Sequence, residues 1–501
     1  MRVLFPLSCT LMLLMTLSAC GESPEQTVQE KPQSKMLNRT DLTAPDAAKK
    51  PKELTIHGDT RIDPYYWLNQ REDEEVLAYL RAENEYQKQM MAHLEDFQDS
   101  LYQEIIGRIK QDDSSVPYLD NGYYYLTRYE EGKEYPIYAR KKGSLEAEEE
   151  IMLDANKLAE PYSYYSVGGR SVSPDNELLA YGEDTLSRRI YTLRFKNLST
   201  GEMLADEIPG TNGSATWAND NKTVFYVLKD PTTLRSYKVM RHTLGTPVEE
   251  DVEVFTEDDE TFLSFVYKTK SDKYVVIGSY ATLSQEYQVL NADDPNGDFR
   301  TIQPRERGLE YDIAHFEDKF YIRTNLDAQN FRLMATDENN TEKENWEEVI
   351  PHRPDVLLED MDIFKEYLVL SERKAGITQL RVRPWAGEEH YIDFGEEAYM
   401  AYTGTNLEFD TEELRIGYTS LTTPNTVFDY NMQSRNFNQL KQQEVLGDFE
   451  PSDYRSERLM IEARDGVEIP VSLVYRKGFR KDGSQPLLLY GYGSYGNSMD
   501  P

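Results

Sequence analysis

The 501-residue sequence predicts a mainly β fold: a seven-bladed β-propeller, with a helical segment before it and the first strands of an incomplete α/β domain after it. Three observations support this prediction. Tyr, which is favoured on half-buried strand surfaces, occurs 36 times. A turn-then-strand unit recurs about every fifty residues through the middle of the chain. The spacing of apolar residues also changes from a helical period to a period of two after Val116.

The first twenty residues have the pattern of an export signal. Arg2 precedes an apolar run, Leu11 to Leu17, that is too short to span a bilayer as a mature helix. Leu17-Ser18-Ala19-Cys20 resembles the bacterial lipobox, in which the cysteine becomes the lipidated first residue after cleavage. An ordinary signal peptide with small residues at its cleavage site is the alternative. We therefore expect residues 1–20 to be a lipoprotein signal peptide and Cys20 to be the lipidated residue.

Lipidation at Cys20 would make the protein an exported, membrane-anchored bacterial lipoprotein that faces the periplasm or the cell exterior. Cys9 and Cys20 are the two cysteines of the sequence, so no disulfide is expected after processing. Residues 21–51 are polar, contain proline and lack periodicity, which predicts a flexible tether.

Residues 52–115 are expected to form an N-terminal helical segment. Apolar residues recur three and four positions apart, which predicts helices with one apolar face, and charged residues fill the other faces. The apolar positions are Val76, Leu77, Leu80, Leu94, Phe97, Leu101 and Ile105.

Residues 116–448 are expected to form the propeller. Each unit begins with a turn rich in Asp, Asn, Glu or Lys, which is followed by a strand of Tyr, Val, Leu and Ile. Seven turns mark the units, at successive steps of 55, 45, 51, 46, 48 and 46 residues: Asn121, Asn176, Asn221, Asp272, Asp318, Glu366 and Glu412. A period near fifty matches a four-stranded blade, which buries its faces only against neighbouring blades.

Residues 449–501 are expected to begin another domain. Arg464-Asp465-Gly466 lies between two strand-like runs and predicts a hairpin. The later sequence PLLLYGYG predicts a continuous apolar strand of the kind that is buried on both faces of an α/β sheet. No helix-forming segment follows it in these 501 residues, so we expect this domain to be incomplete.

The composition argues against several functions. The formal net charge of −35 repels nucleic acids and anionic membrane surfaces, and it attracts cationic ligands. General solubility is the simpler explanation of this charge, which does not by itself identify a substrate. The sequence contains no phosphate-binding loop, no zinc motif and no G-x-S-x-G motif. The nearest match to G-x-S-x-G is at Ser494, but Tyr492 occupies the position of the first glycine. We therefore expect no metal, no cofactor and no nucleic acid. All six histidines precede the last module and are expected at the surface or in packing roles.

Several long stretches, in order along the chain, resemble the prolyl oligopeptidase family of serine peptidases, and its oligopeptidase B branch in particular. They are DPYYWL, RYEEGKEYPIYARKKG, NFRLM, EVLGDFEPSDYRSERL and DGSQPLLLYGYGSYGNSMD. The resemblance implies a seven-bladed propeller that caps an α/β-hydrolase domain, built from the N-terminal helical segment and the C-terminal part. It also implies hydrolysis of short peptides after Arg or Lys.

The resemblance assigns roles to three residues. Tyr492 matches a tyrosine whose hydroxyl stabilises the oxyanion, a role that suits a preorganised phenol donor. Tyr495 matches an aromatic residue that lines the pocket for the residue before the scissile bond. Asp500 matches an acidic residue that contacts a basic side chain of the substrate by a charge-assisted bond. The alternatives are that Tyr492 packs under a turn and that Asp500 is a solvated loop acid.

The catalytic Ser, Asp and His of the family have no counterpart within these 501 residues. Because the three residues of a triad act as a unit, we expect this polypeptide to be catalytically inert alone. The alternative hypothesis is a non-catalytic, membrane-tethered propeller that binds peptides or proteins.

Overall fold

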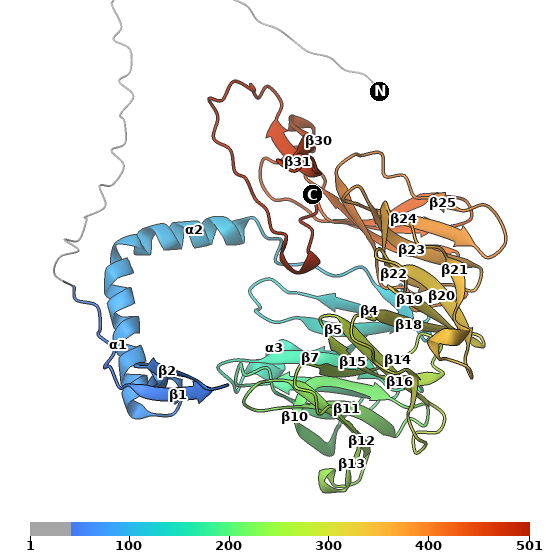
Figure 1. Ribbon diagram of the computed structural model, residues 1–501, viewed down its shortest axis with the longest axis horizontal. Coiled ribbons are helices and arrows are strands. Elements are labelled where there is room, and N and C mark those ends of the chain that lie inside the picture. Colours follow the sequence, from blue (N-terminus) through green and yellow to red (C-terminus); the bar gives the residue numbers. More distant parts are fainter. Residues whose placement is uncertain (1–41) are drawn as a thin grey trace, which may run out of the picture. The chain divides into compact units, whose positions relative to one another are not determined.

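The computed structural model describes residues 42–501 of the chain (Figure 1). The predicted signal peptide, the lipidation site Cys20 and most of the predicted tether lie outside the described residues. Residues up to Gly107 belong to one compact unit, and Arg108–Pro501 form a second. No helix within residues 42–501 has the length and apolar character needed to cross a bilayer.

The first unit contains the predicted helices. Its elements are β1 (Lys52–Ile56), β2 (Asp59–Asp63), a 3-10 turn (Tyr66–Asn69), α1 (Glu74–Met91), a second 3-10 turn (Ala92–Leu94) and α2 (Glu95–Gly107). The carboxylate of Asp73 caps α1 by accepting the amide hydrogen of Glu75 at 2.8 Å. The antiparallel β1–β2 hairpin was not predicted. Its two-residue turn places His57 and Gly58 at positive φ, without the Asn-Gly signal that usually marks such turns.

The second unit is mainly β and contains five separate four-stranded antiparallel sheets. Their strands, sheet by sheet, are β3 (Tyr118–Asp120), β4 (Tyr123–Arg128), β5 (Ile137–Lys142) and β6 (Glu149–Asp154); β14 (Leu263–Lys268), β15 (Tyr274–Ala281), β16 (Ser284–Asn291) and β17 (Arg300–Gln303); β18 (Tyr311–Phe316), β19 (Lys319–Thr324), β20 (Arg332–Asp337) and β21 (Glu347–Ile350); β22 (Val356–Ile363), β23 (Tyr367–Lys374), β24 (Ile377–Pro384) and β25 (His390–Tyr391); β26 (Tyr399–Thr403), β27 (Glu413–Ser420), β28 (Thr426–Asn431) and β29 (Phe437–Gln442).

A further sheet has seven strands in sequential order. They are β7 (Ser166–Val172), β8 (Leu178–Asp184), β9 (Tyr191–Asn197), β10 (Met203–Trp217), β11 (Thr223–Lys229), β12 (Ser236–Thr243) and β13 (Val252–Thr256). The prediction of seven separate four-stranded blades is therefore wrong: five form. The reason is β10, which continues for 15 residues without a turn, pairing first with β9 and then with β11.

Four of the seven residues that marked the repeat share a backbone geometry. Asn121, Asn176, Asn221 and Asp272 adopt positive φ of 45°, 67°, 59° and 57°, which Asn and Asp tolerate best among residues with a side chain. The turns also contact one another, because the Asn121 side-chain amide donates to the carbonyl oxygen of Pro174 at 2.7 Å. The repeat signal in the sequence therefore corresponds to a real structural unit.

The core lies between successive sheets. One buried cluster joins Val276 of β15 to Phe320 of β19, and another joins Leu380 of β24 to Ile416 of β27. The first and last sheets are also linked, since the Arg415 guanidinium donates to the carbonyl oxygen of Pro117 at 2.9 Å. Each sheet is thus stabilised mainly by its neighbours, as in a propeller.

The C-terminal residues form a hairpin and a loop. The predicted hairpin is confirmed as β30 (Tyr454–Glu462) paired with β31 (Glu468–Arg476). The predicted apolar strand is wrong: Leu487, Leu488 and Leu489 belong to no strand and are 80–88% exposed. A strand requires a partner for its backbone groups, and no described residue pairs with this segment. The described residues therefore do not show the start of an α/β-hydrolase sheet.

The remaining short elements lie in loops of the second unit. They are α3 (Ala155–Ala159) and 3-10 turns at Val248–Glu250, Lys343–Asn345, Pro451–Asp453 and Ser494–Gly496.

Candidate active-site loop

The candidate site is the loop that runs from Gly491 to Asp500. A 3-10 turn, Ser494–Gly496, forms its middle, and the amide of Asn497 donates to the carbonyl oxygen of Ser494 at 3.2 Å. Tyr495 has φ 60° and ψ 26°, the left-handed conformation that a residue with a large side chain rarely adopts. Such strain at a loop tip is common at functional positions.

Tyr492 and Tyr495 both reach solvent. Their side chains are 52% and 90% exposed, and neither hydroxyl forms a hydrogen bond with residues 42–501. A Cβ atom added at Gly491 or Gly493 would meet nothing within 4 Å. The loop therefore leaves space beside Tyr492, and the role of its hydroxyl as an oxyanion donor stays a prediction.

Asp500 forms an ion pair with Arg373 of β23. No described contact joins Asp500 to the hydroxyl of Tyr492 or Tyr495. The two guanidinium nitrogens Nη1 and Nη2 donate to Oδ1 at 2.5 Å and to Oδ2 at 3.0 Å. The side chains are 15% exposed for Arg373 and 13% for Asp500, so water has little access to the pair. Asp500 is thus an engaged carboxylate, and its contact with a substrate stays a prediction.

Arg373 has a second carboxylate partner, because its Nε donates to Oε1 of Glu359 at 2.6 Å. Partial burial opposes the charged form of the guanidinium. The hydrogen bonds to Asp500 and Glu359 outweigh this and raise the pKa of Arg373 above its ordinary value. Arg373 could not be identified from a local pattern, because its partner Asp500 lies 127 positions away.

The turn that joins β23 to β24 also contacts the C-terminal hairpin. The Arg458 guanidinium donates to the carbonyl oxygen of Ala375. Gly376 has φ +81°, and a Cβ atom there would lie 2.9 Å from Cγ of Pro470. The propeller thus supplies one turn against which both β31 and the end of the loop are placed.

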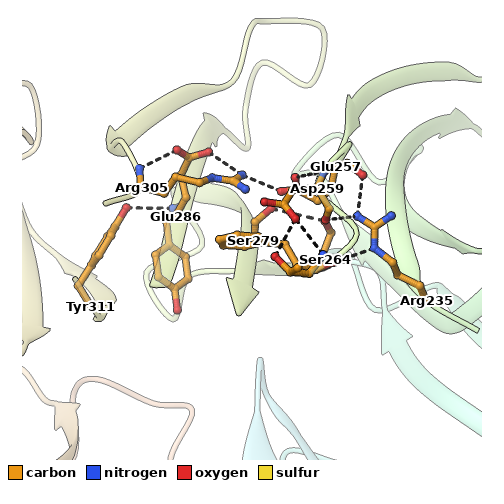
Figure 2. A network of polar contacts seen from close by, with 11 residues as sticks. Arg235, Glu257, Asp259, Ser264, Ser279, Glu286, Arg305 and Tyr311 are labelled. Carbon is orange, nitrogen blue, oxygen red and sulfur yellow. Dashed lines mark hydrogen bonds and ion pairs between the residues drawn. The ribbon is translucent and has the colours of Figure 1, made fainter. Parts of the chain in front are cut away.

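A polar network, shown in Figure 2, joins loops on the propeller. Arg305 donates to Glu257 at 2.6 Å and to Glu286 at 3.3 Å, while Arg235 donates to the carbonyl oxygen of Phe262 at 2.8 Å. Burial opposes the charge on Arg305, but its hydrogen bonds to Glu257 and Glu286 raise the pKa of Arg305 above its ordinary value. Glu257 is only 4% exposed, so these pairs hold the loops after β13 and β17 together.

This network lies at the same end of the sheets as the β23–β24 turn. In an antiparallel four-stranded sheet, the turn between the second and third strands and the loop after the fourth strand emerge at one end. Arg305 occupies the loop after the fourth strand of its sheet. Glu257 follows β13, the last strand of the seven-stranded sheet, and Arg235 lies in the turn between β11 and β12, which emerges at the same end of that sheet. None of these residues was predicted from the sequence, because single charged residues in loops carry no periodic signal.

A serine, a histidine and a glutamate do meet elsewhere in the propeller. Nδ1 of His315 lies 2.9 Å from Oγ of Ser271, and Nε2 lies 3.0 Å from Oε2 of Glu338. Lys273 and Tyr274 also donate to Glu338, so its carboxylate is shared among three side chains. Ser271 lies in a β14–β15 turn, at the end of the sheets opposite to the β23–β24 turn. We interpret the group as a buried junction between two sheets.

The comparisons with known proteins agree with the fold. Residues 45–443 match the family described as prolyl oligopeptidase, N-terminal β-propeller domain. Dipeptidyl aminopeptidase BI of Pseudoxanthomonas mexicana is 43% identical over 92% of this chain and 66% of its own length. Protease 2 of Moraxella lacunata is 35% identical over 92% of this chain and 67% of its own length. The chain thus spans about two thirds of these relatives.

Solved structures give the same result. Oligopeptidase B from Leishmania major has a TM-score of 0.85 and 32% identity, covering 92% of this chain and 69% of that one. Oligopeptidase B from Trypanosoma brucei, with covalently bound antipain, has a TM-score of 0.83 and 31% identity over 92% of this chain and 69% of its own. The resemblance noted in the sequence is confirmed: the chain belongs to the prolyl oligopeptidase family of serine peptidases, with its N-terminal β-propeller domain at residues 45–443.

Proposed function

We propose that this chain is the propeller-bearing part of an oligopeptidase B-like serine peptidase that hydrolyses short peptides after Arg or Lys. The observation that carries the proposal is the exposed Tyr492 loop at the end of a propeller of this family. The similar structure named oligopeptidase B supports short peptides as substrates, and cleavage after Arg or Lys rests on the resemblance seen in the sequence. The strongly acidic composition also suits basic peptides.

The proposed role of Tyr492 predicts a specific kinetic effect. In a complete peptidase that contains these 501 residues together with the family's catalytic Ser, Asp and His, Tyr492→Phe is expected to lower kcat by about two to three orders of magnitude, because one oxyanion donor is lost. KM for a fluorogenic Arg-Arg peptide should change little. Ser494→Ala, two positions away in the same loop, is the matched control. Equal kcat for Tyr492→Phe and the parent enzyme would refute the role, and faster cleavage after Pro than after Arg would refute the substrate class.

We infer that the propeller has seven blades, two of which share β10. The first part of β10 pairs with β9, through Met203 and Ile208, and closes a four-stranded unit that begins at β7. The last part, Ala215–Trp217, pairs with β11 and opens a unit that ends at β13. Counted in this way, the seven-stranded sheet supplies two blades beside the five separate ones.

We propose further that the protein is exported and anchored to the membrane through lipid on Cys20. The proposal rests on the lipobox-like Leu17-Ser18-Ala19-Cys20. Mass spectrometry of the protein from a detergent-solubilised membrane fraction should find an acylated N-terminal cysteine. Cys20→Ala should abolish acylation and membrane association; an unmodified N-terminus elsewhere would refute the proposal.

A further inference from the structure

Three contacts join the C-terminal residues to the end of β23 and to the turn between β23 and β24. Arg458 of β30 donates to the carbonyl oxygen of Ala375, and Pro470 of β31 packs against Gly376. Arg373, at the end of β23, binds Asp500. The hairpin and the end of the loop therefore depend on the same propeller element.

The loop between these two anchors is long. From Lys477 to Met499 it contains no strand, and its one 3-10 turn is exposed. Within the described part of the chain, Arg373–Asp500 is the one hydrogen-bonded or ionic contact between residues 477–501 and the propeller. Tyr492 and Tyr495 lie a few residues before this contact. The position of both tyrosines therefore depends on how Asp500 is held.

Arg373 is well suited to hold it. A planar guanidinium that donates two parallel bonds to one carboxylate fixes the orientation of that carboxylate as well as its position. The third bond, from Nε to Glu359, fixes the guanidinium itself on the neighbouring strand β22. A lysine at this position would supply the charge but could not form all three bonds in one plane.

We propose that Arg373 is a positioning residue of the propeller, which holds the loop bearing Tyr492 and Tyr495 through Asp500. That the loop serves catalysis rests on the proposed function; the anchoring itself does not. One consequence follows for specificity. Both Asp500 oxygens are already bound, so a basic side chain of a substrate that reaches Asp500 has to compete with Arg373 for them.

The test measures the position of the loop in the 501-residue chain, without any need for activity. The two native cysteines, Cys9 and Cys20, are replaced by serine. Spin labels are then attached to Met499→Cys in the loop and to Lys319→Cys, an exposed position on β19. The distribution of distances between the labels, measured by double electron–electron resonance, reports how well the loop is fixed.

We expect a narrow distribution in the parent and a distribution at least twofold wider in Arg373→Ala. Asp500→Asn removes the negative charge that pairs with the guanidinium and should widen the distribution similarly. Arg373→Lys should give an intermediate width. Lys374→Ala is the matched control, since Lys374 is the next residue and pairs at the surface with Asp355. It should leave the width unchanged.

A charge exchange makes the test specific to the pair. Glu359→Gln is introduced first, so that an acidic residue at position 373 meets no carboxylate there. In this background Arg373→Asp should widen the distribution, and the addition of Asp500→Arg should narrow it again. Circular dichroism and the melting temperature show that each variant is folded.

Equal widths in the parent, Arg373→Ala and Asp500→Asn would overturn the proposal, as would the failure of the exchanged pair to restore the narrow distribution. Neither result bears on whether the family's peptidase activity is present. Conversely, an inactive enzyme with an ordered loop would count against the proposed function alone.

Discussion

At the residue scale, several titratable side chains are buried and paired with partners that lie far away in the sequence. His242 and His315 are buried, in the packing role that was one of the two expected for the histidines, and His242 contacts Asp251 at 2.6 Å and Asp206 at 3.1 Å. Asp500, expected as a loop acid open to a substrate, is bound by Arg373. These pairings could not be predicted, because each joins residues 9 to 127 positions apart without a local pattern.

His315 gives a prediction about pH. Burial lowers its pKa below the ordinary value of 6.5, and this outweighs the hydrogen bond to Glu338, which raises it. The folded state therefore binds a proton at His315 less readily than the unfolded state does. The contribution of neutral His315 to the free energy of unfolding is present above about pH 6.5 and is lost as pH falls below that value. His315→Gln, which keeps a donor and an acceptor but does not titrate, should reduce the loss of unfolding free energy between pH 7.5 and pH 5.5. Urea unfolding at the two pH values measures it, and an unchanged loss would contradict this account.

At the element scale, the sequence predicted those elements that carry a repeating pattern. The helices α1 and α2 follow from apolar residues three and four positions apart, and the hairpin β30–β31 follows from Asp465-Gly466 between strand-like runs. The continuous β10 and the unpaired Leu487–Leu489 segment were mispredicted for one reason. Whether a run of residues forms a strand depends on the neighbour with which it pairs, and that neighbour is not encoded locally.

β10 gives a prediction about its bend. Gly213 has φ +93°, and a Cβ atom there would lie 2.7 Å from the ring of Tyr191. Gly213→Ala should therefore suffer both backbone strain and a clash. Gly201 has a similar φ of +77° but nothing within 4 Å of a Cβ, so Gly201→Ala isolates the strain. We expect Gly213→Ala to lower the free energy of unfolding by about 1–3 kcal/mol more than Gly201→Ala does. Equal effects in chemical denaturation would show that Tyr191 moves aside without cost.

At the scale of the whole molecule, the propeller was predictable and its blade boundaries were not. The period near fifty follows from polar turns such as Asn121 and Asn176, and the marker residue has positive φ in four of the seven units. The junction between the first and last sheets, in contrast, depends on residues about 300 positions apart, such as Arg415 and Pro117. A repeat in the sequence indicates that the sheets pack on one another. The repeat does not indicate which side chains join the first sheet to the last.

The junction predicts where the propeller opens first. Arg415 binds Asp429 through two bonds, at 2.6 and 3.2 Å, as well as the Pro117 carbonyl, and a cavity of about 420 Å³ lies beside it. Arg415→Ala should lower the free energy of unfolding by about 1–3 kcal/mol, because the carboxylate loses its partner. It should also increase hydrogen exchange in β3 and β29 more than in β15. Lys365→Ala, which removes an exposed ion pair with Asp410, is the control. A uniform increase across all sheets would contradict a weak junction.

The central proposal is that these 501 residues carry Tyr492 of the oxyanion site of a serine peptidase but not its catalytic Ser, Asp and His. Hydrolysis of a fluorogenic Arg-Arg peptide by the purified 501-residue chain tests it most directly. The account predicts no hydrolysis above the rate without protein, and no difference between the parent and Tyr492→Phe. Hydrolysis that Tyr492→Phe abolishes would contradict it, because it would show that a complete catalytic site lies within this chain.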